Sequence, residues 1–234
     1  MNIHQKFDVW SLVQNNEFEK ACEIADAGYE AVGYAPFLRN KVYALFHLER
    51  YIEAVHLSDK LIEIEGGRIS TDYIHSGIAN WILGNYSKSI EAWQEAQNCN
   101  YKDAVGGMDT LLLLYFAAIK TNDGKLRLSA VREIKKLLKS KLALNYPGPL
   151  GHYLLEEITE KQLIGYVAKV PILKERELCQ AHFVSAIKVL EKGDTNAYYR
   201  KLRECINYGS ASYLEGVYYL AKAELENRTK SDNP

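Results

Sequence analysis

The sequence predicts an all-α protein built as an array of helical hairpins, and three observations support this. Apolar residues recur with the helical period along the chain, whereas alternating runs rich in Val, Ile and Thr are nearly absent. Short polar turns recur, at Asn15-Asn16, Glu49-Arg50, Gly84-Asn85, Asn122-Asp123-Gly124 and Gly193-Asp194. The first four turns lie roughly 34 to 38 residues apart, a spacing typical of helix–turn–helix repeats.

The first three hairpins share an aromatic residue just after the turn and a small residue three positions later. The aromatics are Phe18, Tyr51 and Tyr86, and the small residues are Ala21, Ala54 and Ser89. Neighbouring members of each set are 33 and 35 residues apart. We expect the aromatic to fill the junction between two helices and the small residue to let them approach closely.

These residues resemble the tetratricopeptide repeat. The third hairpin matches best, with residues at the family's aromatic, glycine and small positions: Tyr73, Gly77, Tyr86, Ser89, Trp93 and Ala96. The second hairpin lacks the glycine, and the repeat-closing proline is missing. The resemblance implies an α-solenoid whose concave groove is lined by the first helix of each hairpin and receives a peptide or a helix.

The remaining elements follow from apolar periodicity and from Pro and Gly. We expect a fourth hairpin over 103–120 and 125–142, short helices over 150–156 and 160–168, a last hairpin over 173–190 and 196–207, and a closing helix over 211–227. Thr159 is a good N-cap for the second short helix. The predicted organisation is therefore hairpins over 1–144, an irregular Pro-bounded segment over 145–172, a C-terminal hairpin and closing helix over 173–228, and a disordered tail over 229–234.

Residues 146–225 carry a second resemblance, to the C-terminal part of bacterial tetratricopeptide adaptors of the new-lipoprotein-I type. The matching features are the start at Tyr146-Pro147, the turn at Ile158-Thr159-Glu160, the Gly193-Asp194 turn and the Ala-x-x-Glu-Leu ending at 221–225. The resemblance implies a bacterial protein. It does not carry over a lipoprotein function, because Cys22 has no apolar segment before it.

The composition excludes several classes of protein. With 47% hydrophobic and 25% charged residues, the chain is too apolar and too evenly mixed to be disordered. A net charge of -1 argues against a dedicated nucleic-acid binder. No apolar window approaches the length of a membrane span, and the N-terminal residues lack the pattern of a signal peptide. We therefore expect a cytoplasmic protein.

No motif for catalysis, phosphate binding or metal binding occurs in the sequence. The nearest approach to a metal pair is Cys179 and His182, three residues apart on one predicted helix, but nothing supplies the remaining ligands. The four cysteines have no CxxC spacing, so we expect them reduced and buried. We expect no catalytic residues, no metal and no cofactor, and hence a protein that is not an enzyme.

Two sets of residues are candidates for binding a partner. The first set lies on helix faces that would line the groove: Lys6, Trp10, Gln14, Arg39, Tyr43, His47, Thr71, Ile78 and Trp81. Several are Trp, Tyr or Arg, the types enriched at binding hot spots, although Trp10 and Trp81 equally suit an inter-helix core.

The second set is a basic patch: Lys125, Arg127, Arg132, Lys135, Lys136 and Lys139. An acidic N-terminal part of the chain precedes the patch: residues 1–100 hold 14 acidic and 8 basic side chains. A solvated outer helix face, a docking face for an acidic partner, and a membrane or nucleic-acid surface are all compatible with it. No aromatics interleave with the lysines, which disfavours nucleic acid.

These observations predict a non-catalytic module that binds a protein or peptide partner in a tetratricopeptide groove. The first alternative is a bacterial immunity protein that binds and neutralises a cognate toxin, for which opposite charge in the two halves would speed association. The second alternative is a peptide-sensing regulator or an enzyme on the same scaffold.

Overall fold

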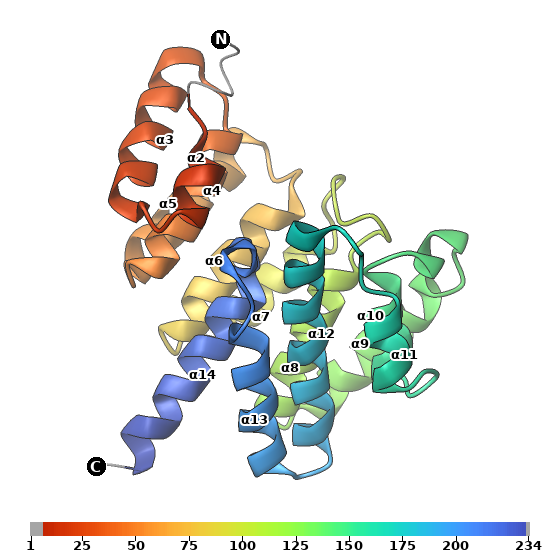
Figure 1. Cartoon of the computed structure of the whole chain (residues 1–234). Coiled ribbons are helices and arrows are strands. Elements are labelled where there is room, and N and C mark those ends of the chain that lie inside the picture. Colours follow the sequence, from red (N-terminus) through yellow and green to blue (C-terminus); the bar gives the residue numbers. More distant parts are fainter. Residues whose placement is uncertain (1–6, 233–234) are drawn as a thin grey trace.

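The computed structural model describes residues 7–232, and every regular element in that range is a helix (Figure 1). A single β-bridge joins Ile69 to Tyr101. The prediction of an all-α protein is therefore confirmed. None of the helices in the described range combines the length and the apolar character needed to cross a bilayer.

Four helical pairs form the first part of the chain. They are α2 (Val9–Gln14) with α3 (Phe18–Val32), α4 (Pro36–His47) with α5 (Tyr51–Ile64), α6 (Ser70–Ile82) with α7 (Tyr86–Ala96), and α8 (Met108–Lys120) with α9 (Gly124–Leu137). The two helices of each pair pack together, and each pair packs on the next. The four expected hairpins are thus present.

One turn geometry recurs in the hairpins because one residue of each turn has a left-handed backbone. Those residues are Asn16, Glu49, Gly84 and Asn122, with Gly193 in the last hairpin. In the third hairpin the N–H of Asn85 donates to the carbonyl of Asn80 at 2.8 Å, five residues back. This bond satisfies a carbonyl that the end of the helix would otherwise leave free, and it reverses the chain.

The second part of the chain holds shorter and longer helices. They are the 3₁₀ turn η1 (Lys141–Leu144), α10 (Gly148–Leu154), α11 (Glu160–Gly165), α12 (Pro171–Glu191), α13 (Thr195–Ile206), the 3₁₀ turn η2 (Ser210–Leu214) and α14 (Gly216–Asp232). Thr159 caps α11 as expected, in a capping box with Gln162.

Several boundaries differ from the expectation. Helix α9 ends at Leu137 rather than at 142, and α11 ends at Gly165 rather than at 168. Helix α8 starts at Met108 rather than at 103, because the Asp103 carboxylate accepts bonds from the N–H groups of a loop that includes Val105 and Gly106. The closing helix is divided, because Glu215 has an extended backbone between η2 and α14. Helix α14 continues to Asp232, over four positions expected in the tail, and residues 233–234 lie outside the described range.

The C-terminal helices pack against the first helices of the hairpins (Figure 1). Helix α14 contacts α6 and α4, while α12 contacts α8. Gly216 permits a close approach of α14 to α6, since a Cβ at this position would lie 2.3 Å from Cδ1 of Ile78. The groove that we expected to be open is therefore occupied by α12 and α14 of the same chain.

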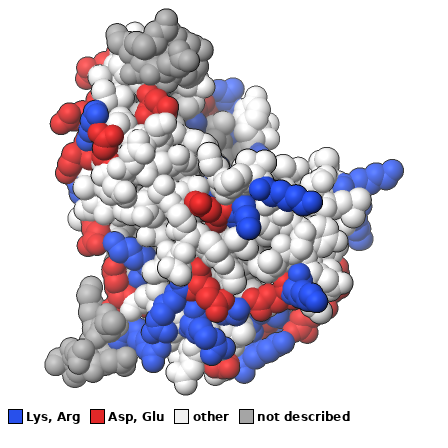
Figure 2. Space-filling view, in the orientation of Figure 1, with Lys and Arg blue, Asp and Glu red and all other residues white. Residues whose placement is uncertain are grey.

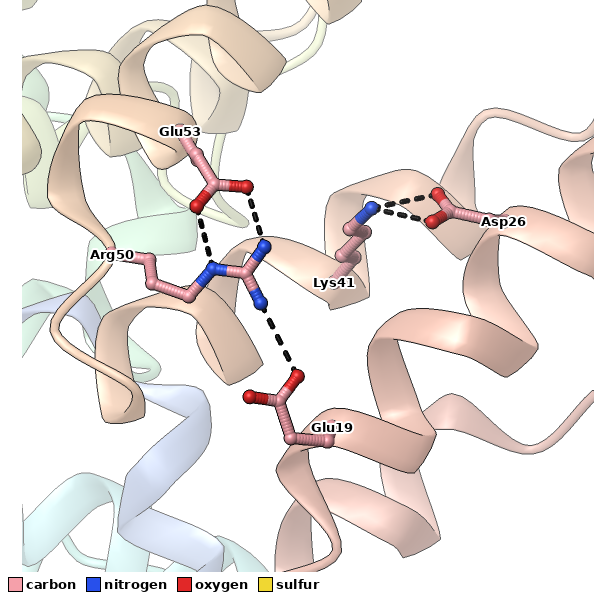
Figure 3. Close-up of polar contacts among 5 residues, drawn as sticks. All are labelled: Glu19, Asp26, Lys41, Arg50 and Glu53. Atoms are coloured by element: carbon pink, nitrogen blue, oxygen red, sulfur yellow. Dashed lines mark hydrogen bonds and ion pairs between the residues drawn. The ribbon is translucent and has the colours of Figure 1, made fainter.

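Ion pairs join α3 to α4 and to the start of α5 (Figure 3). The guanidinium of Arg50 donates to both oxygens of Glu53 at 2.6 Å and to Glu19 of α3 at 3.2 Å. Lys41 of α4 donates to both oxygens of Asp26 at 2.8 and 2.7 Å. The side chains of Arg50 and its partners are exposed, whereas Lys41 is partly buried. Surface pairs of this kind contribute about 0–1 kcal/mol each, so they refine the packing of α3, α4 and α5 rather than cause it.

Candidate functional site

The groove candidates of the first hairpin lie at the edge of the closed groove. Trp10 is 39% exposed, and its Nε1 donates to Oδ1 of Asn40 at 2.9 Å. The guanidinium carbon of Arg176 lies 5.4 Å from the centre of the Trp10 ring, within the range of a cation–π contact. Gln14 is partly exposed, and Lys6 lies outside the described residues.

Arg39 is committed to an internal ion pair. Its Nε and Nη2 donate to the two oxygens of Asp72 at 2.5 and 2.9 Å, and Asp72 is 1% exposed. A fork-to-fork pair of this kind fixes α4 against α6. Arg39 is therefore not a free groove residue, which corrects the expectation.

His47 and Trp81 are also structural. The His47 ring stacks on Phe18 at 4.1 Å between centroids and contacts Tyr213 edge-on at 4.2 Å. Burial lowers the pKa of His47 to about 4, with a further contribution from Lys222. Trp81 is 5% exposed and packs on Phe116 at 4.9 Å. Neither side chain offers an open groove surface, because α14 and its neighbours cover both.

A buried carboxylate ties Trp81 to the C-terminal helices. Glu224 of α14 accepts from Nε1 of Trp81 at 3.4 Å, from Nζ of Lys120 at 2.5 Å and from the hydroxyl of Tyr198 at 3.0 Å. One side chain thereby links α6, α8, α13 and α14. The closure of the groove thus includes charged hydrogen bonds as well as apolar contact.

The other three groove candidates meet at a cavity inside the closed groove. Tyr43 of α4, Thr71 and Ile78 of α6 line a space of about 180 Å³ between these helices and α8, α12, η2 and the start of α14. About half of the lining is apolar, including Ile74, Leu112, Leu113, Phe183, Val184 and Val217. These three candidates therefore lie on the sides of α4 and α6 that face the cavity.

Polar side chains from four elements interrupt the apolar lining. The Glu215 carboxylate accepts from Nε of Arg176 and from the amide of Gln180, each at 2.5 Å. His75 is 1% exposed, and its Nδ1 has no hydrogen bond within the described part of the chain. Asp109 also lines the cavity. An internal space with several polar groups is able to hold a small polar ligand.

The basic candidates lie on the outer side of α9. Five exposed residues follow one another at intervals of three or four positions: Lys125, Leu128, Arg132, Lys135 and Lys139. The first four share one face of α9, and Lys139 lies in the turn just after the helix ends at Leu137. We call these five residues the α9 stripe. Lys136 lies beside the stripe and pairs with Glu133 at 2.9 Å, as Arg132 does at 3.1 Å. Arg127 instead turns toward α12 and pairs with Glu191.

Exposed leucines accompany these cations. Leu128 within the stripe is 67% exposed, and Leu142 and Leu144 of the following turn η1 are 59% and 70% exposed. Within residues 7–228, no ion pair involves Lys125, Lys135 or Lys139. The outer side of α9 therefore combines unpaired positive charge with apolar side chains.

One cluster has the composition of a metal site. Ligand atoms of Glu160, His182 and Glu204 lie within 4.8 Å of one another. However, the ammonium of Lys201 donates to Glu160 at 2.7 Å and to Glu204 at 2.8 Å. This lysine supplies the positive charge that a cation would otherwise bring, so the cluster is a complete ion-pair network.

The cysteine pattern gives no second ligand set. The sulfur of Cys179 lies 3.4 Å from the sulfur of Cys205 on α13, and both are fully buried. Cys22 and Cys99 are buried as well. The four thiols are free and buried, in agreement with the expectation.

Sequence reasoning missed His75, Asp109, Arg176, Gln180 and Glu215. They come from separate stretches of the chain, and no motif links them. The sequence held one local signal. Glu215 is an acidic residue next to Gly216 in an otherwise apolar stretch, and such a residue is a candidate for a buried acid beside a close helix contact. The five residues meet at one cavity because of the way α14 packs on the earlier helices. The spacing of apolar residues does not predict that packing.

Comparison with known proteins adds no relative. No protein-family model matches the chain, and no match emerges from the search of curated proteins.

Proposed function

We propose that this chain is a non-catalytic protein-interaction module whose first four hairpins are tetratricopeptide-type repeats. We further propose that it binds an acidic segment of a partner protein on the α9 stripe, in a cytoplasmic setting. The observation that carries the proposal is the α9 stripe, whose three lysines have no ion partner among the described residues and stand with the exposed Leu128, together with a concave side that the chain itself fills.

Packing in the hairpins supports the repeat assignment. The three small residues after the turns, Ala21, Ala54 and Ser89, are all fully buried. Gly77 lies against the indole of Trp93, where a Cβ would come within 2.2 Å of Nε1. Close helix contacts at the glycine and small positions agree with the pairing that the tetratricopeptide pattern implies.

The concave side is filled by α12 and α14, which supports a partner surface elsewhere on the molecule. A long peptide in the groove would have to displace α14 from Ile78, from Trp81 and from the Glu224 network. A partner on the outer side of α9 displaces only water. Binding there therefore has the smaller reorganisation cost.

Charge and exposure at the stripe support an acidic partner with apolar anchors. The four cations of the stripe attract an acidic segment and speed its approach, while the exposed leucines contribute buried apolar area on contact. Figure 2 shows the contrasting N-terminal helices, where acidic side chains gather at the upper left, together with a largely uncharged middle of that face. The acidic N-terminal part of the chain would repel the same partner and favour one orientation.

The test uses a displayed library of peptides of about twelve residues that combine Asp or Glu with one or two Leu or Phe. The peptide selected on the wild-type chain is then measured against the double variant Lys135→Glu/Lys139→Glu. We expect at least a tenfold loss of affinity, and weaker wild-type binding as salt rises.

The matched control is Lys88→Glu/Lys161→Glu, which makes the same change in net charge at exposed lysines away from α9. We expect this control to bind like the wild type. Equal losses in both variants would mean a general charge effect and would contradict the proposal. Tighter binding of an unrelated single-stranded oligonucleotide than of any selected peptide would also contradict it.

A further inference from the structure

The cavity inside the closed groove holds one acidic group without a partner. Two carboxylates line it, and the one on Glu215 is already satisfied by Arg176 and Gln180. The side chain of Asp109 has no hydrogen bond or ion pair within the described residues. Its backbone N–H donates to Asp103 at 2.9 Å, so the start of α8 holds Asp109 in place.

Burial raises the pKa of Asp109 well above its usual range, and the carboxylates of Asp103 and Glu215 raise it further. Arg176 also lines the cavity and lowers this pKa, but its guanidinium is already paired with Glu215, so an ionised Asp109 remains costly. A positive charge beside the carboxylate would remove that cost, because opposite charges interact strongly where water is scarce.

The neighbouring polar groups are suited to receive hydrogen-bond donors. Burial lowers the pKa of His75 to about 3, so its ring is neutral and one of its nitrogens is an acceptor. Thr71 and Tyr43 line the same space and carry hydroxyl oxygens that accept as well as donate. An ammonium group has three donors and no acceptor, which matches this set.

The rest of the lining defines the body of the ligand. Leucine, isoleucine, valine and phenylalanine side chains form about half of the cavity lining. For comparison, an engineered apolar cavity of about 150 Å³ binds benzene. A space of about 180 Å³ therefore accommodates a short alkyl or aryl group with an attached charge.

We propose that this cavity is a binding site for a primary ammonium group on a short apolar chain, with Asp109 as its counter-ion. Three features carry the proposal: a partnerless carboxylate, a neutral buried histidine and an apolar wall of the right size. Arg176 marks the edge of the site, since it lies over the exposed Trp10 and is 26% exposed itself. The proposal is independent of partner binding on α9.

The test compares three probes of similar size: n-butylammonium, neutral 1-pentanol and the anion pentanoate. Each is titrated into the full chain and followed by methyl NMR, with Ile74, Ile78, Val184 and Val217 as reporters of the cavity. We expect saturable shifts at these methyl groups with n-butylammonium, and at least tenfold weaker binding of the other two probes.

The variant Asp109→Asn keeps the shape of the side chain and removes its charge. We expect it to weaken n-butylammonium binding at least tenfold. The control Glu23→Gln, at an exposed acid on α3, should bind like the wild type. Calorimetry in two buffers of different ionisation enthalpy adds a second readout, because a proton exchanged on binding appears as a buffer-dependent heat.

Several results would overturn the proposal. They are no saturable binding of n-butylammonium, equal binding of 1-pentanol, preference for pentanoate, or unchanged affinity in Asp109→Asn. The comparison of the three probes is made on the wild-type chain. It therefore tests the proposal even where a variant fails to fold.

The source of the ammonium is resolved by three further probes. These are a pentapeptide with a free amino terminus and no lysine, its N-acetylated form, and the acetylated form with one lysine. Binding of the first alone indicates a chain terminus, binding of the third and not of the second indicates a lysine side chain, and binding of none indicates a small free amine.

Discussion

At the scale of single residues, Gly77 shows how one missing side chain allows a helix pair to form. The Trp93 indole is fully buried against α6, and its Nε1 donates to the carbonyl of Ile74 at 3.3 Å. A methyl group at position 77 would overlap this ring. The glycine is therefore needed for close approach and not for an unusual backbone angle.

We expect Gly77→Ala to lower the free energy of unfolding by about 1–3 kcal/mol, the usual cost of overpacking. Gly165→Ala is the control, since nothing lies within 4 Å of its added Cβ. Urea unfolding of both variants checks the prediction. Equal stability of Gly77→Ala and wild type would show that Trp93 does not occupy this position.

His47 makes stability depend on pH. An unfolded histidine has a pKa of about 6.5, whereas burial and Lys222 lower the pKa of folded His47 to about 4. Between these values the unfolded chain binds a proton that the folded chain does not, so stability falls as pH falls from 6.5 toward 4. The slope is at most about 1.4 kcal/mol per pH unit.

We expect His47→Gln to reduce this slope when urea unfolding is measured at pH 7, 6 and 5. His56→Gln is the matched control, at an exposed histidine on α5, and it should follow the wild-type slope. Parallel curves for wild type and His47→Gln would contradict the burial of His47.

At the scale of helical elements, the recurring turn was only partly predictable from sequence. The polar turn residues locate all five hairpin turns, because Asn and Gly favour the left-handed backbone that closes a helix. Glu49 has the same backbone angle without that preference, and tertiary packing of α4 and α5 holds it there. The Asp103 carboxylate binds the N–H groups of the loop before α8, so the helix begins at Met108. The spacing of apolar residues did not predict this start.

Two glycines separate the effect of backbone angle from that of packing. Gly84 and Gly124 both have open space around an added Cβ, but only Gly84 has a positive φ, of 81°. We expect Gly84→Ala to cost about 1 kcal/mol and Gly124→Ala to cost little or to stabilise. Thermal unfolding of the two variants measures the difference, and equal melting temperatures would contradict the turn geometry.

At the scale of the whole molecule, the main event is the return of α14 over α4 and α6. The sequence predicted a closing helix but not its destination, since an apolar face does not specify which surface covers it. As a result Tyr43, Thr71 and Ile78 line an internal cavity rather than an open groove, and Trp81 takes the inter-helix core position that the sequence had left open. The α9 face remained outside this closure, so its predicted charges are visible in the structure.

The contact between Gly216 and Ile78 tests the closure directly. We expect Gly216→Ala to destabilise the chain by about 1–3 kcal/mol, because the new methyl group overlaps Cδ1 of Ile78. Ile78→Val removes that atom, so the double variant should regain at least about 0.5 kcal/mol over additivity. Strictly additive losses would mean that α14 does not meet α6 at this point.

Hydrogen–deuterium exchange of the chain, alone and bound to the selected acidic peptide, tests the central claim most directly. The α9 stripe as the partner surface predicts new protection over 124–144 and unchanged exchange in α4, α6 and α14. Protection concentrated in α4 and α6, together with faster exchange in α14, would show that the partner opens the groove and would contradict the account.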